Sequence, residues 1–277
     1  MPSSLTAAIV TWRPDPALLE RTVASLAAAA ARARLSGTLS TATLFLVDNG
    51  PPSALPTLDA AAARWDGTLG AVEIVSGQGN VGYGRANNLV IPRLESDFHL
   101  ILNPDVEIDP EALDAALRSF AAHPGVGMLA PAAFAPDGKR EYLCKRYPSM
   151  SVLLLRGFAP AFVRNRFEGA LARYEMRDVI GERFVEDVPL ASGCFLLART
   201  PLLQALGGFD PAYFMYFEDY DLSMRMAGRA HVAYEPAARI VHHGGDAARK
   251  GARHIGWFVA SALRFFSRHG WAWRPRA

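Results

Sequence analysis

The segment from Tyr213 to Asp221 combines acidic and aromatic side chains in an unusual way. Glu218, Asp219 and Asp221 occupy three of four consecutive positions, next to five aromatic residues between Tyr213 and Tyr220. In the first turn of a surface helix, acidic residues simply complement the helix dipole. Carboxylates placed among apolar rings instead have raised pKa values and suit general acid–base catalysis. We therefore expect this segment to provide a catalytic carboxylate.

Two more acidic positions follow apolar runs that read as strands. Asp48 ends the run LFLVD, and the Asn-Gly pair after it predicts either a tight turn or a carboxylate that binds a base or ribose. Asn103-Pro104-Asp105 follows FHLIL, and Pro104 ends the strand. Oxygens of Asn103 and Asp105 can then face one Mg²⁺ ion, which takes one or two carboxylates beside phosphate and water. An ordinary Asn-Pro-Asp turn is the alternative.

A glycine-containing loop and a pair of histidines complete the candidate set. The stretch GYGRANN, from Gly82 to Asn88, lacks the third glycine of a dinucleotide fingerprint and follows the third strand, which argues against an NAD site. It predicts either a tight packing corner or a helix N-terminus that holds an anion. His242 and His243 precede two glycines and a basic cluster, a composition suited to metal and diphosphate contacts.

The elements expected to position these residues alternate along the first 130 residues. Strands are predicted at Leu5–Trp12, Thr43–Val47, Ala71–Val75, Phe98–Leu102 and Val126–Leu129. Helices are predicted at Asp15–Arg34, Ser53–Trp65, Gly82–Leu94 and Pro110–His123, the last with Asp109 as N-cap. This alternation predicts right-handed βαβ units around a mostly parallel sheet, whose ligands bind at the carboxyl ends of the strands.

The alternation stops near residue 131. An apolar stretch at Ser151–Phe167 contains three arginines, a strand is expected at Cys194–Ala198, and a short helix at Pro201–Leu206. A further helix begins near Glu218. The tail at Arg253–His269 has apolar residues at helical spacing with arginines around them.

Composition excludes several classes of protein. The 277 residues carry 29 Lys+Arg and 27 Asp+Glu, a net charge of +2, which is too balanced to indicate a nucleic-acid binder. A hydrophobic content of 51% with 20% charged residues excludes a disordered chain. No apolar run is long enough for a membrane span, and the N-terminus does not resemble a signal peptide. Cys144 and Cys194 lack metal-site spacing, so we expect a cytoplasmic protein without structural zinc.

Taken together, these segments resemble the inverting family 2 glycosyltransferases, specifically the bacterial rhamnosyltransferase-like branch of the GT-A fold. The matching pieces, in the order of the family, are IVTW, LVDNG, GNVGYGRANN, LNPDVEI, SGCFLLART, GGFDPAYFMYFEDYDLSMR and VHHGG. They extend from about residue 5 to residue 245. The resemblance implies a Rossmann-like α/β/α sandwich with a mostly parallel central sheet over residues 1–245. Residues 246–277 would form a C-terminal helical extension.

The resemblance also implies roles for individual residues. Asp219 would be the general base, and Glu218 would orient it or bind an acceptor hydroxyl, while Asp221 would cap the helix or pair with Arg225. Ser192 and Gly193 would lie near the donor sugar or the acceptor. The nucleotide would be held by Thr11, Trp12, Asp48, Gly82, Arg85, Asn88 and Asn103.

The expected cofactor is Mg²⁺ or Mn²⁺, held against the donor diphosphate by Asp105 and His242. Asn103 replaces the first carboxylate of the DxD motif of the family, which removes one charge from the metal site. Asp246-Ala247-Ala248 stands where the family often has Ser or Thr, so Arg249 or Lys250 would contact the diphosphate. His243 is an alternative to His242.

The expected reaction moves a sugar, most simply L-rhamnose from dTDP-L-rhamnose, to a hydroxyl of a glycan or lipid-linked glycan in bacterial surface polysaccharide synthesis. Another UDP-, dTDP- or GDP-sugar remains an alternative donor. A nucleotidyltransferase and a non-catalytic nucleotide-sugar or glycan-binding protein are the competing classes, and IVTWRPDP lacks the phosphate loop of the former. The basic aromatic tail suits contact with the inner face of the cytoplasmic membrane, packing on the core, or dimerisation.

Overall fold

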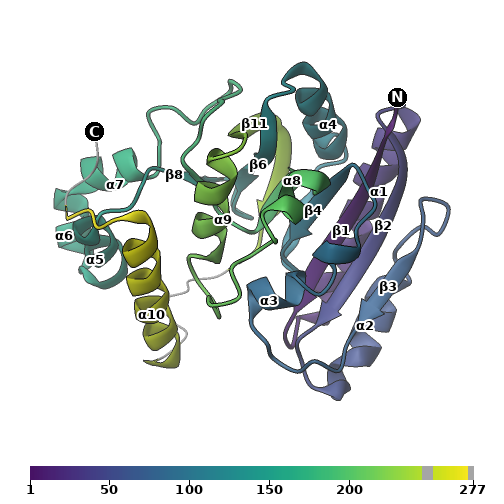
Figure 1. The fold of residues 1–277 in the computed structure, drawn as a ribbon, viewed down its shortest axis with the longest axis horizontal. Helices are drawn as coiled ribbons and strands as arrows, with labels where there is room; N and C mark the ends of the chain where they lie inside the picture. Colours follow the sequence, from purple (N-terminus) through teal and green to yellow (C-terminus); the bar gives the residue numbers. More distant parts are fainter. Residues whose placement is uncertain (245–251, 274–277) are drawn as a thin grey trace.

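The computed structural model describes residues 1–244 and 252–273 as an α/β fold around one large sheet (Figure 1). Its strand order is β3-β2-β1-β4-β10-β6-β11-β5, with β7 beside β6. The strands are β1 (Ser3–Thr11), β2 (Leu39–Asp48), β3 (Val72–Val75), β4 (Phe98–Leu102), β5 (Val106–Ile108), β6 (Val126–Phe134), β7 (Arg140–Glu141), β10 (Phe195–Arg199) and β11 (His231–His242). A second sheet pairs β8 (Cys144–Lys145) with β9 (Leu190–Ala191).

Most strands of the large sheet point the same way, as predicted. Strands β3, β2, β1 and β4 are parallel to one another. Strand β10 is antiparallel to both β4 and β6, and β11 is parallel to β6, so β6 and β11 share the direction of the first four. Strands β10 and β5 therefore begin at the edge where the parallel strands end.

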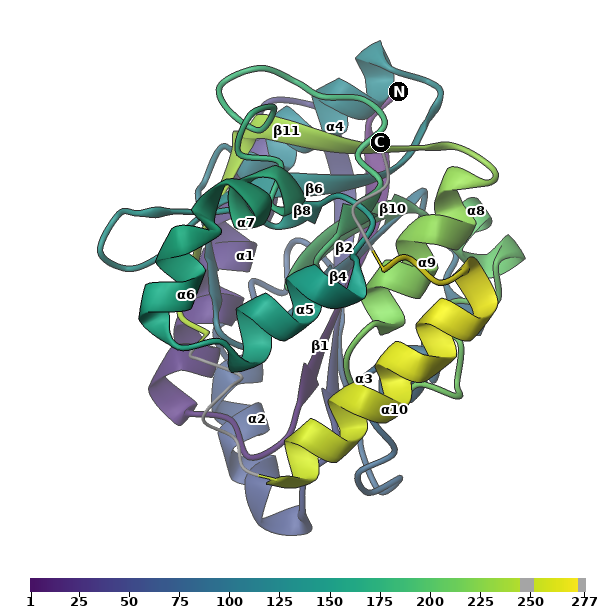
Figure 2. The ribbon, with the colours of Figure 1, turned by 90° about the vertical axis from the view of Figure 1, so that its left-hand side faces the viewer.

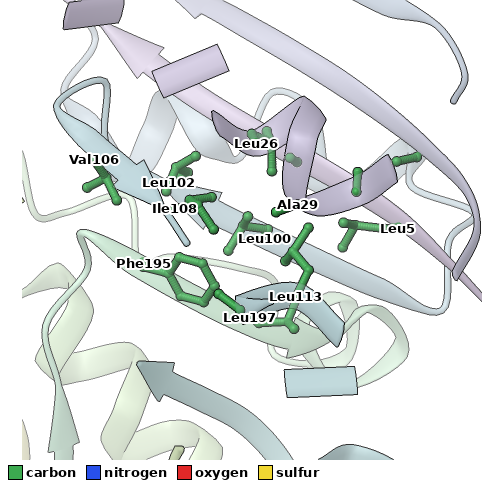
Figure 3. Packing of buried hydrophobic residues seen from close by; sticks show 14 of the residues in the cluster. Leu5, Leu26, Ala29, Leu100, Leu102, Val106, Ile108, Leu113, Phe195 and Leu197 are labelled. Atoms are coloured by element: carbon green, nitrogen blue, oxygen red, sulfur yellow. The ribbon is translucent and has the colours of Figure 1, made fainter. Parts of the chain in front are cut away.

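Helices cover both faces of this sheet. On one face lie α1 (Pro16–Leu35), α2 (Leu55–Ala62) and α4 (Ala112–Ala122); on the other lie α3 (Tyr83–Asn87), α8 (Thr200–Ala205) and α9 (Glu218–Ala227). Figure 3 shows the first face, where Leu26 and Ala29 of α1 pack over Leu100 of β4. Asp15 caps α1 by accepting from the Leu18 N–H at 2.9 Å. The sandwich predicted from the sequence is confirmed.

Four further helices lie beside the sandwich. They are α5 (Met150–Phe158), α6 (Ala161–Arg166), α7 (Glu168–Tyr174) and α10 (Ala252–His269), which gather at one end of the molecule (Figure 2). Helix α10 buries Phe265 and Phe266 completely, in a cluster with Tyr213, Phe217 and Leu153. These two rings of the tail pack on the core, and contact of the tail with a membrane or with a second copy stays a prediction. Within the described residues, no helix has the length and apolarity needed to span a membrane.

Some predicted elements differ from the structure. The helix expected over residues 82–94 ends at Asn87, and only a 3₁₀ turn at Ile91–Arg93 follows, because Pro92 lacks an N–H group. The helix expected from Ser53 starts as a 3₁₀ turn at Pro52–Ala54, and the one expected from Pro110 begins at Ala112. Strand β11 was not predicted, since its pairing with β6 shifts register between Glu235 and Arg239, around Pro236.

Candidate active site

The residues selected from the sequence meet at one edge of the sheet. Thr11 and Asp48 are register partners at the ends of β1 and β2. The Asn103 N–H, just after β4, donates to the Cys194 carbonyl at 2.9 Å, just before β10. At the far side, the His243 N–H donates to the Asp105 carbonyl at 2.8 Å. Strands β10 and β5 run opposite to their neighbours β4 and β11. The residues just before β10 and β5 therefore lie beside the residues just after β4 and β11.

The carboxylate of Asp219 is held by backbone donors at the start of α9. Its Oδ2 accepts from the Gly193 N–H and its Oδ1 from the Tyr220 N–H, both at 2.8 Å. Burial raises the pKa of Asp219, while these two bonds and one from the Ser192 side chain oppose the rise. The result is a fixed carboxylate of increased basicity, which is what a general base requires.

A strained turn places this helix start. Tyr216 and Phe217 adopt left-handed backbone conformations, with φ of 71° and 63°, which are rare for aromatic residues. Their surroundings hold them there: Phe217 packs on Phe265 with ring centroids 5.3 Å apart, and the Ser261 hydroxyl donates to the Met215 carbonyl at 2.8 Å. Such strain persists only where packing enforces it, and it clusters at functional sites.

Glu218, the neighbour of Asp219, is buried, and its Oε2 has no hydrogen-bond partner among the described residues. Burial, together with the negative charge of Asp219, raises the pKa of Glu218 to about 8. The backbone donors that reach Asp219, and that Glu218 Oε2 lacks among the described residues, favour Asp219 as the charged member of the pair. Different surroundings commonly assign different roles to neighbouring carboxyl groups in this way.

Asp105 and His242 face each other where β5 begins and β11 ends. His242 Nε2 lies 3.7 Å from Asp105 Oδ1, and its Nδ1 lies 2.9 Å from Glu141 Oε2. His243 Nε2 instead lies 2.7 Å from Glu107 Oε1. The geometry thus favours His242 over His243 as the partner of Asp105. A carboxylate behind the histidine is the usual outer partner of a metal-binding imidazole.

The Asp105–His242 pair fits a divalent cation that a diphosphate helps to bind. Asp105 Oδ1 is buried and has no hydrogen-bond partner among the described residues. Gly244 leaves the space open, since a Cβ there would lie 2.4 Å from His242 Nε2 and 3.2 Å from Asp105 Oδ2. Over residues 1–244 and 252–273, no three His, Cys, Asp or Glu side chains are grouped to hold a metal. Two protein ligands are nevertheless sufficient where phosphate and water complete the shell.

The residues expected to bind the nucleotide base and ribose differ in their surroundings. Thr11 is fully buried, and its hydroxyl has no partner among the described residues. Asp48 accepts from the Gly50 N–H at 2.8 Å, which is the tight turn foreseen for this position. Trp12 is 56% exposed, with the Arg13 guanidinium carbon 5.3 Å from the ring centroid. Nucleotide binding by these residues stays a prediction.

The other expected donor-binding residues make structural contacts. Both ends of the Asn88 amide bond to the Phe209 backbone, at 2.7 and 2.9 Å, so this side chain fixes the turn after α8. Arg85 donates to the Pro211 carbonyl and is exposed. At Gly82, with φ of 94°, a Cβ would lie 2.6 Å from the Phe214 carbonyl. These three residues support the loop before α9, and donor contact by them stays a prediction. Arg249 and Lys250 lie outside the described residues.

Two residues of the site were missed by sequence reasoning. Glu141, on the two-residue strand β7, orients His242, and no motif around it indicates this role. The Tyr83 hydroxyl donates to the Gly193 carbonyl at 3.1 Å, on the peptide next to the one whose N–H binds Asp219. Tyr83 lies between Gly82 and Gly84 in the GYGRANN stretch, and an aromatic residue between two glycines could have indicated a role in the site. In contrast to these two residues, Asp221 behaves as expected: its Oδ2 lies 2.7 Å from Arg225 Nε on the same helix.

Comparison with protein families decides how this site is classified. The family model described as glycosyltransferase-like family 2 matches residues 2–254. The chain belongs to this family. The protein is therefore a glycosyltransferase. The same conclusion follows from named relatives.

The chain is similar to two named rhamnosyltransferases. It is 31% identical over 284 residues to the N-acetylglucosaminyl-diphospho-decaprenol L-rhamnosyltransferase of Mycobacterium tuberculosis, covering 96% of this chain and 85% of that protein. It is 23% identical over 208 residues to the rhamnosyltransferase WbbL of Escherichia coli K12, covering 71% and 74% of the respective chains. These names fit an enzyme of cell-surface polysaccharide synthesis.

Solved glycosyltransferases share the GT-A fold of this chain. The structure of GalNAc-T7 with UDP, GalNAc and Mn²⁺ superposes with a TM-score of 0.61 and 13% identity, over 91% of this chain and 45% of that one. The mannosyltransferase PcManGT of Pyrobaculum calidifontis, with GDP-Man and Mn²⁺, gives a TM-score of 0.59 and 16% identity, over 95% and 65%. Our chain thus spans less than half of the first of these proteins.

Proposed function

We propose that the protein is an inverting glycosyltransferase that moves L-rhamnose from dTDP-L-rhamnose to a lipid-linked N-acetylglucosaminyl diphosphate. The placement of Asp219 carries the inverting part of this proposal: a partly buried carboxylate, fixed by two backbone donors, at the same sheet edge as the Asp105–His242 pair. The name of the M. tuberculosis relative supports the sugar and the acceptor.

In this proposal Asp219 removes the proton from the acceptor hydroxyl while that oxygen forms a bond to the anomeric carbon. The bond from this carbon to the diphosphate oxygen breaks in the same step, and dTDP leaves from the opposite face, so the configuration inverts. General-base assistance of this kind contributes about 10²- to 10⁴-fold. The raised pKa of Asp219 suits this role, and neutral Glu218 leaves the charge on Asp219.

The leaving diphosphate gains negative charge as the bond breaks. Asp105 and His242 would hold Mg²⁺ or Mn²⁺, which when bound supplies electrostatic stabilisation of that charge. Glu141 keeps the His242 ring oriented through Nδ1. The backbone links the metal pair to the base. The Cys194 carbonyl accepts from the Asn103 N–H, two residues before Asp105, and the neighbouring Gly193 N–H donates to Asp219.

The donor assignment requires a selectivity test. Purified protein is incubated with dTDP-L-rhamnose, UDP-N-acetylglucosamine, UDP-galactose and GDP-mannose, each with a short-chain lipid diphosphate N-acetylglucosamine acceptor and Mg²⁺ or Mn²⁺. We expect product with dTDP-L-rhamnose alone, with the opposite anomeric configuration to the donor. Turnover of a UDP- or GDP-sugar in its place would overturn the donor assignment and leave the family intact.

The base is tested with Asp219→Asn, which keeps the shape of the side chain and removes its basicity. We expect kcat to fall about 10²- to 10⁴-fold with KM for the donor nearly unchanged. Asp59→Asn, at an exposed position of α2, is the matched control and should retain full activity. Comparable activity of the two variants would rule out Asp219 as the base.

A further inference from the structure

Two stretches of the chain carry cations but no acidic residue. Residues 142–167 contain five Lys or Arg, and residues 247–277 contain seven, with no Asp or Glu in either. The remaining 17 cations share the rest of the chain with all 27 acids. Charge is therefore segregated along the sequence, although the net charge is close to zero.

The fold brings these two stretches to the same side of the molecule. The first contains α5 and α6, and the second contains α10. These helices lie at the left end in Figure 1, and Figure 2 shows the same end face-on, with all three toward the viewer. The Met150 N–H donates to the Ala272 carbonyl at 2.8 Å, and the Tyr147 hydroxyl donates to the Gly270 carbonyl. We call the joint surface of α5, α6, α10 and residues 271–273 the basic face.

The basic face exposes many large apolar side chains. Helix α6 has no buried residue, and Phe162 is 75% exposed. On α10, the exposed aliphatic residues Ile255, Val259 and Leu263 follow one another at intervals of four residues, along one side of the helix. The large apolar residues exposed on the basic face, or directly after α6, are Leu154, Phe162, Phe167, Ile255, Val259, Leu263, Trp271 and Trp273. Large apolar side chains exposed on neighbouring elements indicate a surface that another phase or molecule covers.

Cations stand among these apolar groups. Arg164 and Arg166 on α6 are exposed, and no described carboxylate forms an ion pair with either. Arg264 and Arg268 of α10 differ, because both bind Asp210, at 2.7 and 2.6 Å. The α6 guanidinium groups are therefore available to an anionic partner. A second copy of this face would bring like charges together, which disfavours self-association through it.

The basic face also borders the candidate active site. On α5, Arg156 lies near Tyr174 and Tyr220, and its positive charge opposes the rise that burial causes in the pKa of both hydroxyls. The Tyr174 and Tyr220 hydroxyls lie 2.9 Å apart, and the Tyr220 N–H donates to Asp219. Only two side chains thus separate α5 from the helix start that carries the proposed base.

We infer that the basic face docks on an anionic phospholipid bilayer, with the α6 arginines at the headgroups and the apolar side chains of α6 and α10 in the interfacial layer. Exposed Phe and Trp beside Arg are the composition of surfaces that lie on membranes. The inference rests on the proposed function only in that a lipid-linked acceptor would be presented to Asp219 from this surface.

The test is vesicle co-sedimentation of the full chain. Vesicles are either neutral phosphatidylcholine or phosphatidylcholine with about a third phosphatidylglycerol. Three double variants are compared with the wild type: R164Q/R166Q, F162S/F167S, and the matched control L35S/R229Q, whose exposed residues lie outside the basic face. Thermal melts confirm that each variant folds.

We expect the wild type and the control to sediment with anionic vesicles and to remain in solution with neutral ones. The two α6 variants should bind roughly tenfold more weakly or worse, because each cation near an anionic surface contributes measurably. Wild type that stays in solution with anionic vesicles, or α6 variants that bind like the control, would overturn the inference. A wild type that dimerises through this face, with dissociation in the α6 variants, would do so as well.

The activity assay separates this inference from the proposed function. R164Q/R166Q should keep wild-type turnover of a water-soluble acceptor and lose turnover of a long-chain acceptor embedded in anionic vesicles. Failure of the wild type on every acceptor would contradict the proposed substrate while leaving the sedimentation result to decide on the membrane.

Discussion

Glu218 and Asp219 show how two adjacent carboxyl groups acquire different properties. Asp219 receives backbone N–H donors from Gly193 and Tyr220, which favour its charged form. Glu218 is buried, and its Oε2 has no hydrogen-bond partner among the described residues. A buried negative charge needs such a partner, so the neutral form of Glu218 is favoured. The identity of the residues matters less here than the number of donors that reach each one.

Glu218→Gln should therefore mimic the neutral form that the Glu218 side chain has at neutral pH. The folded pKa of about 8 lies above the ordinary value of 4.5, so the wild type loses stability as pH rises from about 4.5 to 8. We expect E218Q to lack this loss and to be more stable than the wild type at pH 8, by on the order of a few kcal/mol. Urea unfolding at pH 5, 6.5 and 8 measures the difference, and parallel pH profiles of the two proteins would contradict it.

Gly193 is the second residue with a sharp expectation. A Cβ there would lie 3.2 Å from the Cβ of Asp219, which is closer than ordinary contact. Gly193→Ala should displace the proposed base and lower kcat roughly 10- to 100-fold, since small misplacements of catalytic groups are costly. Gly181→Ala, where a Cβ meets nothing within 4 Å, is the control. Steady-state kinetics at saturating donor would show equal kcat values if the backbone at 193 had no positioning role.

At the scale of elements, an ionic clamp joins the helix of the proposed base to the C-terminal helix. Asp221 of α9 is completely buried, binds Arg225 on its own helix, and lies 2.8 Å from His269 Nε2 of α10. Arg268 of α10 lies 3.4 Å from the same carboxylate. Helix α10 thus contributes to the position of α9, together with the aromatic packing around Phe217.

Asp221→Asn should weaken this clamp strongly, because it leaves the largely buried Arg225 without its counter-charge. We expect the free energy of unfolding to fall by about 3 kcal/mol or more. Glu73→Gln, which removes an exposed ion pair with Arg93, should cost less than about 1 kcal/mol. Chemical denaturation of both variants measures the contrast. Equal costs would mean that the clamp contributes no more than a surface pair.

Elements with a clean pattern could be predicted from the sequence, and interrupted ones could not. The run FHLIL is strand β4 with the predicted limits, since five buried residues are bounded by polar ones. Strand β11 escaped because Pro236 and a register shift break its alternation. The helix after Gly82 cannot continue through Pro92. Its end is in addition held by a tertiary contact, because the Asn88 side chain binds the backbone of Phe209, 121 residues away.

The candidate site likewise contains residues that local sequence predicts and residues that only the fold reveals. Motifs at strand ends predicted that Asp48 and Asp105 would share an edge, because parallel strands end together. His242 was expected beside Asp105 only from the family resemblance, because strand β11 was not predicted. The pairing of Asp105 with His242 and not His243 depends on the register of β11 against β5, which local sequence does not encode. Glu141 depends in addition on the short hairpin of β6 and β7, so its role became visible only in the folded chain.

For the whole molecule, binding of the donor product should be linked to the metal. With Mn²⁺ present, a hundredfold excess of dTDP over Kd should raise stability by about 2.7 kcal/mol, or Tm by roughly 5 to 10 °C. EDTA should reduce this shift because the diphosphate loses its cation. Asp105→Asn should reduce it similarly, whereas Asp59→Asn should not. A dTDP shift unaffected by EDTA would show that the nucleotide binds without the metal.

The segregation of charge makes the protein an electric dipole whose strength its net charge conceals. The sequence pI is about 8.6, so above that pH the molecule as a whole is weakly anionic. The face of α5, α6 and α10 remains cationic there, because arginine keeps its proton. A cation-exchange resin should therefore retain the protein at pH 9. In the field of any anionic surface the same dipole rotates the molecule before contact, so that α6 arrives first and the edge with Asp219 follows.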